Sequence, residues 1–154
     1  MIVALVGTSH LEFRRFIVAV SKLKNDCSLD CVIQHGHSKL DGTDLEGFDF
    51  CSNNDLLELI SKSELIICQA GFGSMFDAIK SGNRVIVIPR KIEFGETDAE
   101  QDSLANHYAK LGLVELCDDP EELTSVYKNK VTNHVPARMG NIPLIKDVLS
   151  EFIN

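Results

Sequence analysis

The amino-acid sequence predicts a single α/β domain in which helices cover both faces of a parallel β-sheet. Short apolar runs alternate with amphipathic segments along the chain. Most of the apolar runs are continuous, which is typical of strands that are buried on both faces. The length of 154 residues suits one domain with one core.

The apolar runs predict the strands of this sheet. They are rich in Val, Ile and Leu and are flanked by polar residues and glycine, as strands are. The predicted strands are 2–6, 30–34, 48–51, 65–68, 85–88 and 114–116.

Amphipathic segments predict a helix after most of these strands. The helix predicted at 10–24 carries its apolar residues on one face: Phe13, Phe16, Ile17, Val20 and Leu23. The helix predicted at 53–61 has Asn53 or Asn54 as its N-cap candidate. The helix predicted at 74–80 is followed by Gly82, a residue that suits a helix C-terminus.

The second half of the chain predicts three more helices. One spans 98–110 and ends before Gly112, and Pro120 opens another at a position that suits proline. The last spans about 143–153. Its apolar positions form one stripe: Leu144, Ile145, Val148, Leu149 and Phe152.

Composition excludes several classes of function. The net charge is −8 and no long basic run is present, so nucleic-acid binding is not expected as the main function. No apolar run approaches the ~20 residues that span a bilayer, and the first residues lack the features of a signal peptide. Five scattered cysteines indicate free thiols in a reducing compartment. These features predict a cytoplasmic protein.

No metal site is predicted from the metal-binding residue types. Cys31, His35 and His37 lie close in sequence, but no second Cys/His pair completes a tetrahedral set. Several carboxylates precede or open the helix predicted at 98–110, where acidic residues stabilise a helix N-terminus. They are Glu93, Glu96, Asp98, Glu100 and Asp102.

Loops rich in glycine and polar residues follow four of the predicted strands. Ligands of parallel sheets bind outside the carboxyl ends of the strands, so these loops are expected to form one site. They span 7–10, 35–39, 69–74 and 90–101.

The loop Gln69-Ala70-Gly71-Phe72-Gly73-Ser74 carries the most specific local pattern. It lacks the third glycine of a dinucleotide fingerprint, the Lys of a phosphate-binding P-loop and the frame of a nucleophile elbow. What remains is a Gly-x-Gly-Ser turn between a strand and a helix. Such a turn can offer backbone N–H groups to an anion, or it can be only a tight turn.

The wider sequence resembles the C-terminal, donor-binding domain of MurG-type glycosyltransferases. The segments that carry the resemblance are "AGFGSMFDAIKSGNRVIVIPR", "EFGETDAEQDSLANHYAKLGLVEL" and "IVALVGTSHLEFRRFIVAV". The resemblance covers residues 1 to about 128 and implies a Rossmann-like domain, the C-terminal half of a GT-B enzyme. It is closest to single-domain relatives: the PssE-type exopolysaccharide subunit and the small cytosolic subunit of the dolichol-pathway UDP-N-acetylglucosamine transferase.

The resemblance implies a site for the donor diphosphate. The residues that would surround the diphosphate are Gly7, Thr8, Ser9, Gly71, Gly73 and Ser74. Gln69 stands where relatives often have histidine, and it can donate a hydrogen bond without adding charge. Arg90 is the best remaining cation for a phosphate, with a surface salt bridge to Glu93 or Glu96 as its equal alternative.

The resemblance also implies residues for the nucleoside and the sugar. Phe50 and Cys51 match a strand end whose backbone meets uracil. Asp77 falls where relatives carry a glutamate that binds the ribose hydroxyls. Gln101 matches a glutamine that reads the transferred sugar, and Glu100 precedes it.

From this resemblance we expect the donor-binding subunit of a UDP-sugar hexosyltransferase that needs no cofactor and no obligatory metal. A membrane-anchored partner would supply the lipid-linked acceptor and the catalytic base, and would hold this chain at the membrane surface. Within the chain, His10 is the candidate base, with His35 and His37 as further options. The helix at 143–153 either contacts the partner or packs on its own sheet.

Two other functions remain open on the sequence. The chain could be a non-catalytic nucleotide-binding or scaffold domain that regulates a membrane partner, which the departures at Gln69 and Asp77 favour. It could also be a lone enzyme acting on nucleosides. The sugar stays undecided among N-acetylglucosamine, glucuronic acid, glucose and galactose.

Overall fold

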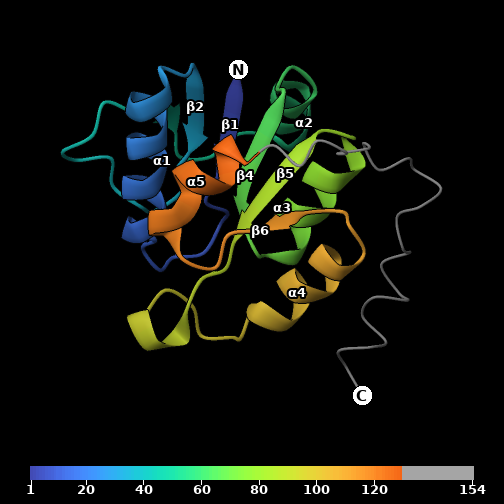
Figure 1. Cartoon of the computed structure of the whole chain (residues 1–154). Helices are drawn as coiled ribbons and strands as arrows, with labels where there is room; N and C mark the ends of the chain where they lie inside the picture. The colour runs from blue at the N-terminus through green and yellow to red at the C-terminus, as the bar shows by residue number, and fades with distance from the viewer. Residues whose placement is uncertain (130–154) are drawn as a thin grey trace.

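Six parallel strands form one sheet in the order β3-β2-β1-β4-β5-β6 (Figure 1). The computed structural model describes residues 1–129. The strands are β1 (Ile2–Leu5), β2 (Cys31–Gln34), β3 (Glu46–Phe48), β4 (Leu65–Gln69), β5 (Arg84–Ile88) and β6 (Glu115–Leu116). The predicted parallel sheet is confirmed, whereas the helix predicted at 143–153 lies outside the described residues.

Helices cover both faces of the sheet, as the sequence predicts (Figure 1). On one face lie α1 (Arg14–Cys27) and α5 (Leu123–Lys128), and on the other lie α2 (Asn53–Ser61), α3 (Phe72–Lys80) and α4 (Asp102–Lys110). Short 3-10 helices, η1 (Ile92–Phe94) and η2 (Pro120–Glu122), precede α4 and α5. No helix among residues 1–129 has the length and apolarity of a membrane span.

Successive residues of the central strands enter opposite cores, because side chains alternate along a strand. Ile2 and Ala4 of β1 pack toward α1, whereas Val3 and Leu5 pack toward α3. Both cores need apolar side chains, which explains why the strands appear as continuous apolar runs.

The third strand begins earlier than predicted, and the prediction of 48–51 is wrong. β3 lies at the edge of the sheet, and Glu46 and Gly47 are exposed, so the strand has no apolar run to reveal it. A Cβ atom at Gly47 would lie 1.8 Å from the carbonyl oxygen of Ile33, so only glycine fits this close strand pair. Phe50 and Cys51 therefore lie beyond the strand.

Several helices begin at other residues than predicted. α1 begins at Arg14, and Ser38 Oγ accepts a hydrogen bond from the backbone N–H of Phe13. The N-cap of α2 is Ser52, whose Oγ accepts from Asp55 N at 3.1 Å, and not Asn53 or Asn54.

The helices at the site also differ in their first residues. α3 begins at Phe72, so Gly73 belongs to its first turn. α4 begins at Asp102 instead of residue 98. Of the carboxylates expected to favour the N-terminus of α4, Asp102 lies in the first turn, and Glu100 accepts from Ser103 N at 2.6 Å.

The buried side chain of Gln34 joins the loops that follow β1 and β3. Gln34 is 6% exposed and ends β2. Its Nε2 donates to the carbonyl oxygens of Gly7 and Asp49 at 3.0 and 2.8 Å, and its Oε1 accepts from Gly7 N at 2.9 Å. One amide thus fixes the positions of two loops at the carboxyl edge of the sheet.

Arg90 joins the loops after β1 and β5 from inside the protein. It is 1% exposed, and its guanidinium lies 4.8 Å from the ring centroid of Phe13. Nη1 donates to the carbonyl oxygens of Leu11 and Glu96 at 2.9 Å, and Nη2 donates to that of Val6 at 3.0 Å. Burial lowers the pKa of Arg90, and the negative charge of Glu96 partly opposes this.

Of the two alternatives for Arg90, the surface salt bridge to Glu93 or Glu96 is therefore wrong. Arg90 is buried, and the carboxylate of Glu96 instead accepts from Arg15 Nε and Nη2 at 2.9 and 2.6 Å. The backbone N–H of Lys91 donates to the same carboxylate at 3.0 Å.

Three cysteines are buried among apolar side chains: Cys31, Cys68 and Cys117. Burial raises the pKa of Cys31 to about 11 and the pKa of Cys68 and Cys117 to about 12. These thiols stay protonated at neutral pH. Cys51, in contrast, is exposed.

Replacing Gln34 with methionine is expected to lower the free energy of unfolding by about 2 kcal/mol. Methionine has a similar length but leaves the N–H and the carbonyl oxygen of Gly7 without their partner, and each unpaired buried group costs about 1–3 kcal/mol. Urea denaturation of Gln34→Met, beside the exposed control Lys39→Met, measures the change. Equal stability of the two variants would contradict this role of Gln34.

Candidate functional site

The candidate site lies where the sheet changes its direction of growth. β1 pairs with β2 on one side and with β4 on the other, so the loops after β1 and β4 diverge at the carboxyl edge of the sheet. Ligands of open parallel sheets bind in the crevice at this point. The structure brings together here the loops in which the sequence predicts the diphosphate site.

The side-chain amide of Gln69 lies between two glycines. A Cβ atom at Gly7 would lie 2.7 Å from Gln69 Nε2, and one at Gly71 would lie 2.0 Å from the same atom. Gly7 also has a φ of +93°, which residues other than glycine rarely adopt. The glycines at both positions are thus explained by the space that Gln69 occupies.

The first turn of α3 begins beside the Gln69 amide, and no described side chain caps it. Gly71 is the N-cap residue and has no side chain to accept from the first N–H groups of α3. Gly73 is exposed, and a Cβ atom there would meet nothing within 4 Å. These N–H groups carry the positive end of the helix dipole and favour an anion. We call Gly7, Gln69, Gly71, Gly73 and Ser74 the anion site.

The remaining residues of the β1 loop differ in exposure. Thr8 and His10 are exposed, and Ser9 is half-buried. Ser9 Oγ accepts from the backbone N–H of Leu11 at 3.1 Å, so this hydroxyl shapes the loop.

Gln101 contacts the anion site through Gln69. Gln101 Oε1 accepts from the backbone N–H of Arg90 at 3.0 Å, and Gln101 Nε2 donates to Gln69 Oε1 at 2.9 Å. The structure therefore brings together two glutamines for which the family resemblance implies contact with the phosphate and with the sugar.

The residues expected to meet uracil lie on the other side of β1. Phe50 is 44% exposed, and its ring lies 5.1 Å from that of His37 in an edge-on arrangement. Phe50 N donates to Asp49 Oδ1 at 2.7 Å, and Cys51 follows as an exposed residue. The bonds of Gln34 to Asp49 and Gly7 fix this loop relative to the anion site.

Two carboxylates near the site differ in environment. Asp77 lies in the second turn of α3, where partial burial raises the pKa of its carboxyl group and the positive charge of Lys80 opposes the rise. Glu100 is exposed, and its bond to Ser103 N gives it a structural role at the N-terminus of α4. Within residues 1–129, no group of three or more His, Cys, Asp or Glu side chains could hold a metal ion.

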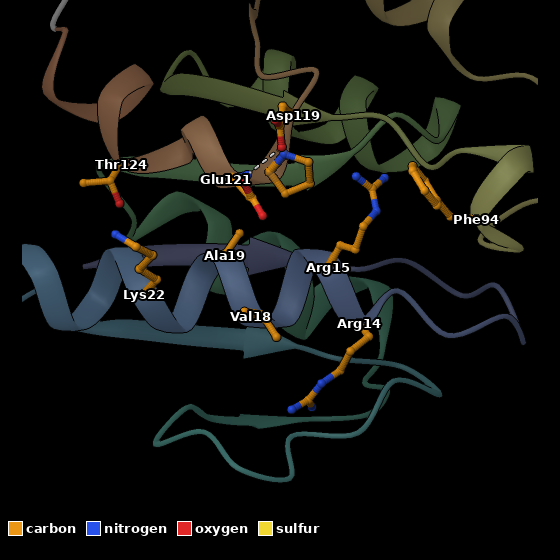
Figure 2. A pocket seen from close by; sticks show the side chains of 10 residues that line it. Arg14, Arg15, Val18, Ala19, Lys22, Phe94, Asp119, Glu121 and Thr124 are labelled. Carbon is orange, nitrogen blue, oxygen red and sulfur yellow. Dashed lines mark hydrogen bonds between the residues drawn. The ribbon is translucent and has the colours of Figure 1, made fainter.

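A cavity of about 690 Å³ lies outside the candidate site, between α1 and the segment η2–α5 (Figure 2). Its lining contains none of the residues predicted for the donor. The guanidinium of Arg15 stacks over the ring of Phe94 at one end, 4.3 Å from the centroid. The lining residues are Arg14, Arg15, Val18, Ala19, Lys22, Phe94, Asp119, Pro120, Glu121 and Thr124.

Sequence reasoning missed Gln34 and, although it named Arg90 as a cation for a phosphate, it missed the interior position of Arg90. Gln34 ends a strand whose other residues are apolar, and a polar side chain at such a position signals an internal hydrogen-bond partner. The burial of Arg90, in contrast, has no such signal, because the residue lies between a strand and a loop that carries several acidic side chains. The direct contact between Gln69 and Gln101 has no sequence signal, because the two residues are 32 positions apart.

The comparisons with known proteins agree with this fold. The family model described as "Glycosyltransferase family 28 C-terminal domain" matches residues 1–143. No curated protein sequence matches the chain.

Several solved glycosyltransferase structures share the fold. The calicheamicin glycosyltransferase CalG4 aligns with a TM-score of 0.64 and 15% identity over 97% of this chain and 38% of its own. MurG of Acinetobacter baumannii aligns with a TM-score of 0.59 and 18% identity over 85% of this chain and 41% of its own. ALG13, solved by NMR, has a TM-score of 0.57 and 18% identity over 88% of this chain and 87% of its own.

The chain thus spans about two fifths or less of CalG4 and MurG, and nearly all of ALG13. The resemblance to the C-terminal half of a GT-B enzyme is confirmed by the family match and by the fold. The chain belongs to the glycosyltransferase family 28 C-terminal domain family and forms a donor-binding domain of the GT-B type.

Proposed function

We propose that the chain is the UDP-sugar-binding half of a hexosyltransferase that acts on a lipid-linked acceptor in polysaccharide or oligosaccharide synthesis. One observation carries the proposal. The Gln69 amide lies between Gly7 and Gly71, directly before the uncapped first turn of α3. This arrangement groups neutral hydrogen-bond donors with the positive end of a helix dipole, which suits a diphosphate.

Sugar transfer from UDP leaves a diphosphate whose negative charge grows in the transition state. Donors already aimed at that charge stabilise the transition state without reorganisation. Arg90, the cation expected for this task, instead donates to backbone oxygens in the interior. The N–H groups of the anion site would therefore supply most of the stabilisation that this domain offers.

The rest of the donor would extend to both sides of the anion site. Phe50 and Cys51 follow β3, and the backbone there would meet uracil, with Asp77 near the ribose. Gln101 and Glu100 follow β5 and would lie on the sugar side. The strand order separates β3 from β5 by three strands, which gives a nucleotide sugar room along the edge.

The proposal includes a partner subunit. A donor and an acceptor bind between two domains in a GT-B enzyme, and this chain spans less than half of the MurG chain. A membrane-anchored partner would supply the acceptor wall and the base, and would keep this chain at the membrane surface. His10 is exposed at the β1 loop and is the candidate base within this domain.

A non-catalytic nucleotide-binding or scaffold domain is the second candidate function. The neutral Gln69 and the interior position of Arg90 favour it, because neither side chain brings a positive charge to the surface of the anion site. Sugar transfer that depends on this chain in the assembled complex would exclude a purely regulatory role.

Replacing Gly73 with valine is expected to abolish UDP binding without unfolding the domain. Apart from its chain neighbours and the backbone of its own helix, no described atom lies within 4 Å of the new Cβ, so the domain has room for the side chain, which would enter the space proposed for the diphosphate. Calorimetry measures binding and urea denaturation measures stability. Thr124→Val, at the second residue of α5 and in the cavity of Figure 2, is the matched control. Parent-like UDP affinity of Gly73→Val would show that the anion site is misplaced.

Uridine binding is expected to weaken as the pH falls. The loss should begin at a higher pH than it would for an aspartate with an ordinary pKa. Burial raises the pKa of Asp77, and only its ionised form accepts two ribose hydroxyl bonds. Uridine is used in place of UDP because it has no phosphate groups whose own protonation would change binding with pH. Asp77→Asn should bind uridine roughly tenfold more weakly at neutral pH and without this pH dependence. A pH profile shared by both proteins would exclude Asp77 from the ribose site.

The purified chain is expected to bind UDP but to transfer no sugar by itself, because it supplies one wall of the cleft. Adding a membrane-anchored acceptor-binding subunit should restore transfer from a UDP-sugar to the lipid acceptor, measured with radiolabelled donor. Full activity of the isolated chain would disprove the half-enzyme proposal.

A further inference from the structure

The amides of Gln69 and Gln101 form a hydrogen-bonded chain with one possible polarity. It begins at the backbone N–H of Arg90, which can only donate, so the group facing it has to be Gln101 Oε1. Gln101 Nε2 then faces Gln69 and donates to its Oε1 at 2.9 Å. Because the oxygen of Gln69 is used in this bond, its nitrogen points the other way. We call these three groups the amide chain.

The amide chain ends at the anion site. Gln69 Nε2 is the atom that would contact a Cβ at Gly7 or at Gly71. No described residue accepts a hydrogen bond from it. The buried unpaired side-chain atoms of residues 1–129 are Arg90 Nε and Tyr108 Oη, so Gln69 Nε2 is not cut off from solvent. An N–H donor thus meets the space between the two glycine loops, although Gln69 as a whole is only 9% exposed.

The backbone N–H of Arg90, where the amide chain begins, is held in place by the side chain of the same residue. The guanidinium of Arg90 bonds to the carbonyl oxygens of Val6, Leu11 and Glu96, which holds the backbone of Arg90 against the β1 loop. The N–H that sets the polarity therefore belongs to a buried and fully packed residue.

We propose that Gln101 is a positioning residue that makes Gln69 present an N–H, and not a carbonyl oxygen, to the donor diphosphate. The proposal rests on the proposed function, since it takes the diphosphate as the ligand of the anion site. A glutamine amide is neutral and can turn over, so alone it could offer an anion either a donor or an acceptor. Gln101 removes this choice, and it does so before the ligand binds.

This role differs from the one that the family resemblance implies for Gln101, which is contact with the transferred sugar. UDP has no transferred sugar, so UDP separates the two roles. If Gln101 only reads the sugar, its replacement leaves UDP affinity unchanged. If it positions Gln69, UDP affinity falls while uridine affinity stays the same, because uridine lacks the diphosphate.

The decisive variant is Gln101→Glu. One oxygen of the introduced carboxylate can still accept from Arg90 N, but the other oxygen now faces Gln69. The Gln69 amide is expected to turn and donate to this carboxylate, which leaves its own carbonyl oxygen toward the diphosphate. A hydrogen bond to a charged group is lost, so we expect UDP to bind roughly ten- to a hundredfold more weakly.

A second background separates this effect from simple repulsion by the new charge. Gln69→Met has a similar length and no amide to turn. In that background, adding Gln101→Glu should weaken UDP binding by less than about threefold, the part that comes from screened repulsion. Calorimetry of the parent, both single variants and the double variant completes the cycle, with urea denaturation of each as a check of folding.

The pH dependence gives an independent readout. When the carboxyl group introduced by Gln101→Glu is protonated, it regains a donor, so it can bond to Gln69 Oε1 and restore the parent polarity. The ratio of UDP affinities between Gln101→Glu and the parent should therefore rise toward one as the pH falls. The same ratio for Gln101→Met should stay constant, because methionine does not titrate.

Each result decides between the alternatives. A large loss in the parent background with little loss in the Gln69→Met background supports the positioning role. Equal losses in both backgrounds, or an unchanged UDP affinity of Gln101→Glu, overturn it and leave the proposed function intact. A parent chain that binds neither UDP nor UDP-sugars overturns the proposed function itself.

Discussion

Arg90 places a positive charge inside the protein, and the loops at the carboxyl edge are arranged around it. A buried charge is costly unless its donors are paired. Backbone oxygens from the end of β1, its loop and the β5 loop accept from Nη1 and Nη2 of the guanidinium, whose Nε has no partner within residues 1–129, and the ring of Phe13 covers one face. Among the described residues, no carboxylate oxygen shares in these bonds. The loops cannot move apart without breaking these hydrogen bonds and exposing the guanidinium to solvent.

Gln34 has the corresponding role on the other side of β1. It satisfies both polar atoms of Gly7 and one of Asp49, so the β1 loop is held from two directions by side chains beneath it. Because these contacts lie beneath the loops, the residues at the surface of the site can be glycines and small polar residues. A diphosphate needs such a surface, because its oxygens approach backbone N–H groups closely.

Apolar runs predicted the sheet because buried parallel strands require them, and five of the six strands lie within one or two residues of their predicted bounds. β3 was misplaced because an edge strand with Glu46 and Gly47 exposed shows no such run. The site was predicted less completely. Glycine and Gly-x-Gly-Ser patterns predicted a candidate anion site, which stays a prediction, and an arginine before a loop of acidic residues looks like a surface cation. Its burial follows only from tertiary contacts, as does the meeting of Gln69 with Gln101.

The space around Gln69 makes three positions of the chain interdependent in evolution and in engineering. With glutamine at 69, an alanine at Gly7 or Gly71 would overlap its amide and force that amide to move, and the φ of +93° at Gly7 disfavours a side chain there as well. A side chain at 7 or 71 would therefore displace the donor group of Gln69, and a smaller residue at 69 would remove it. Directed evolution of this domain toward other nucleotide sugars is therefore expected to retain this trio and to change the residues outside it.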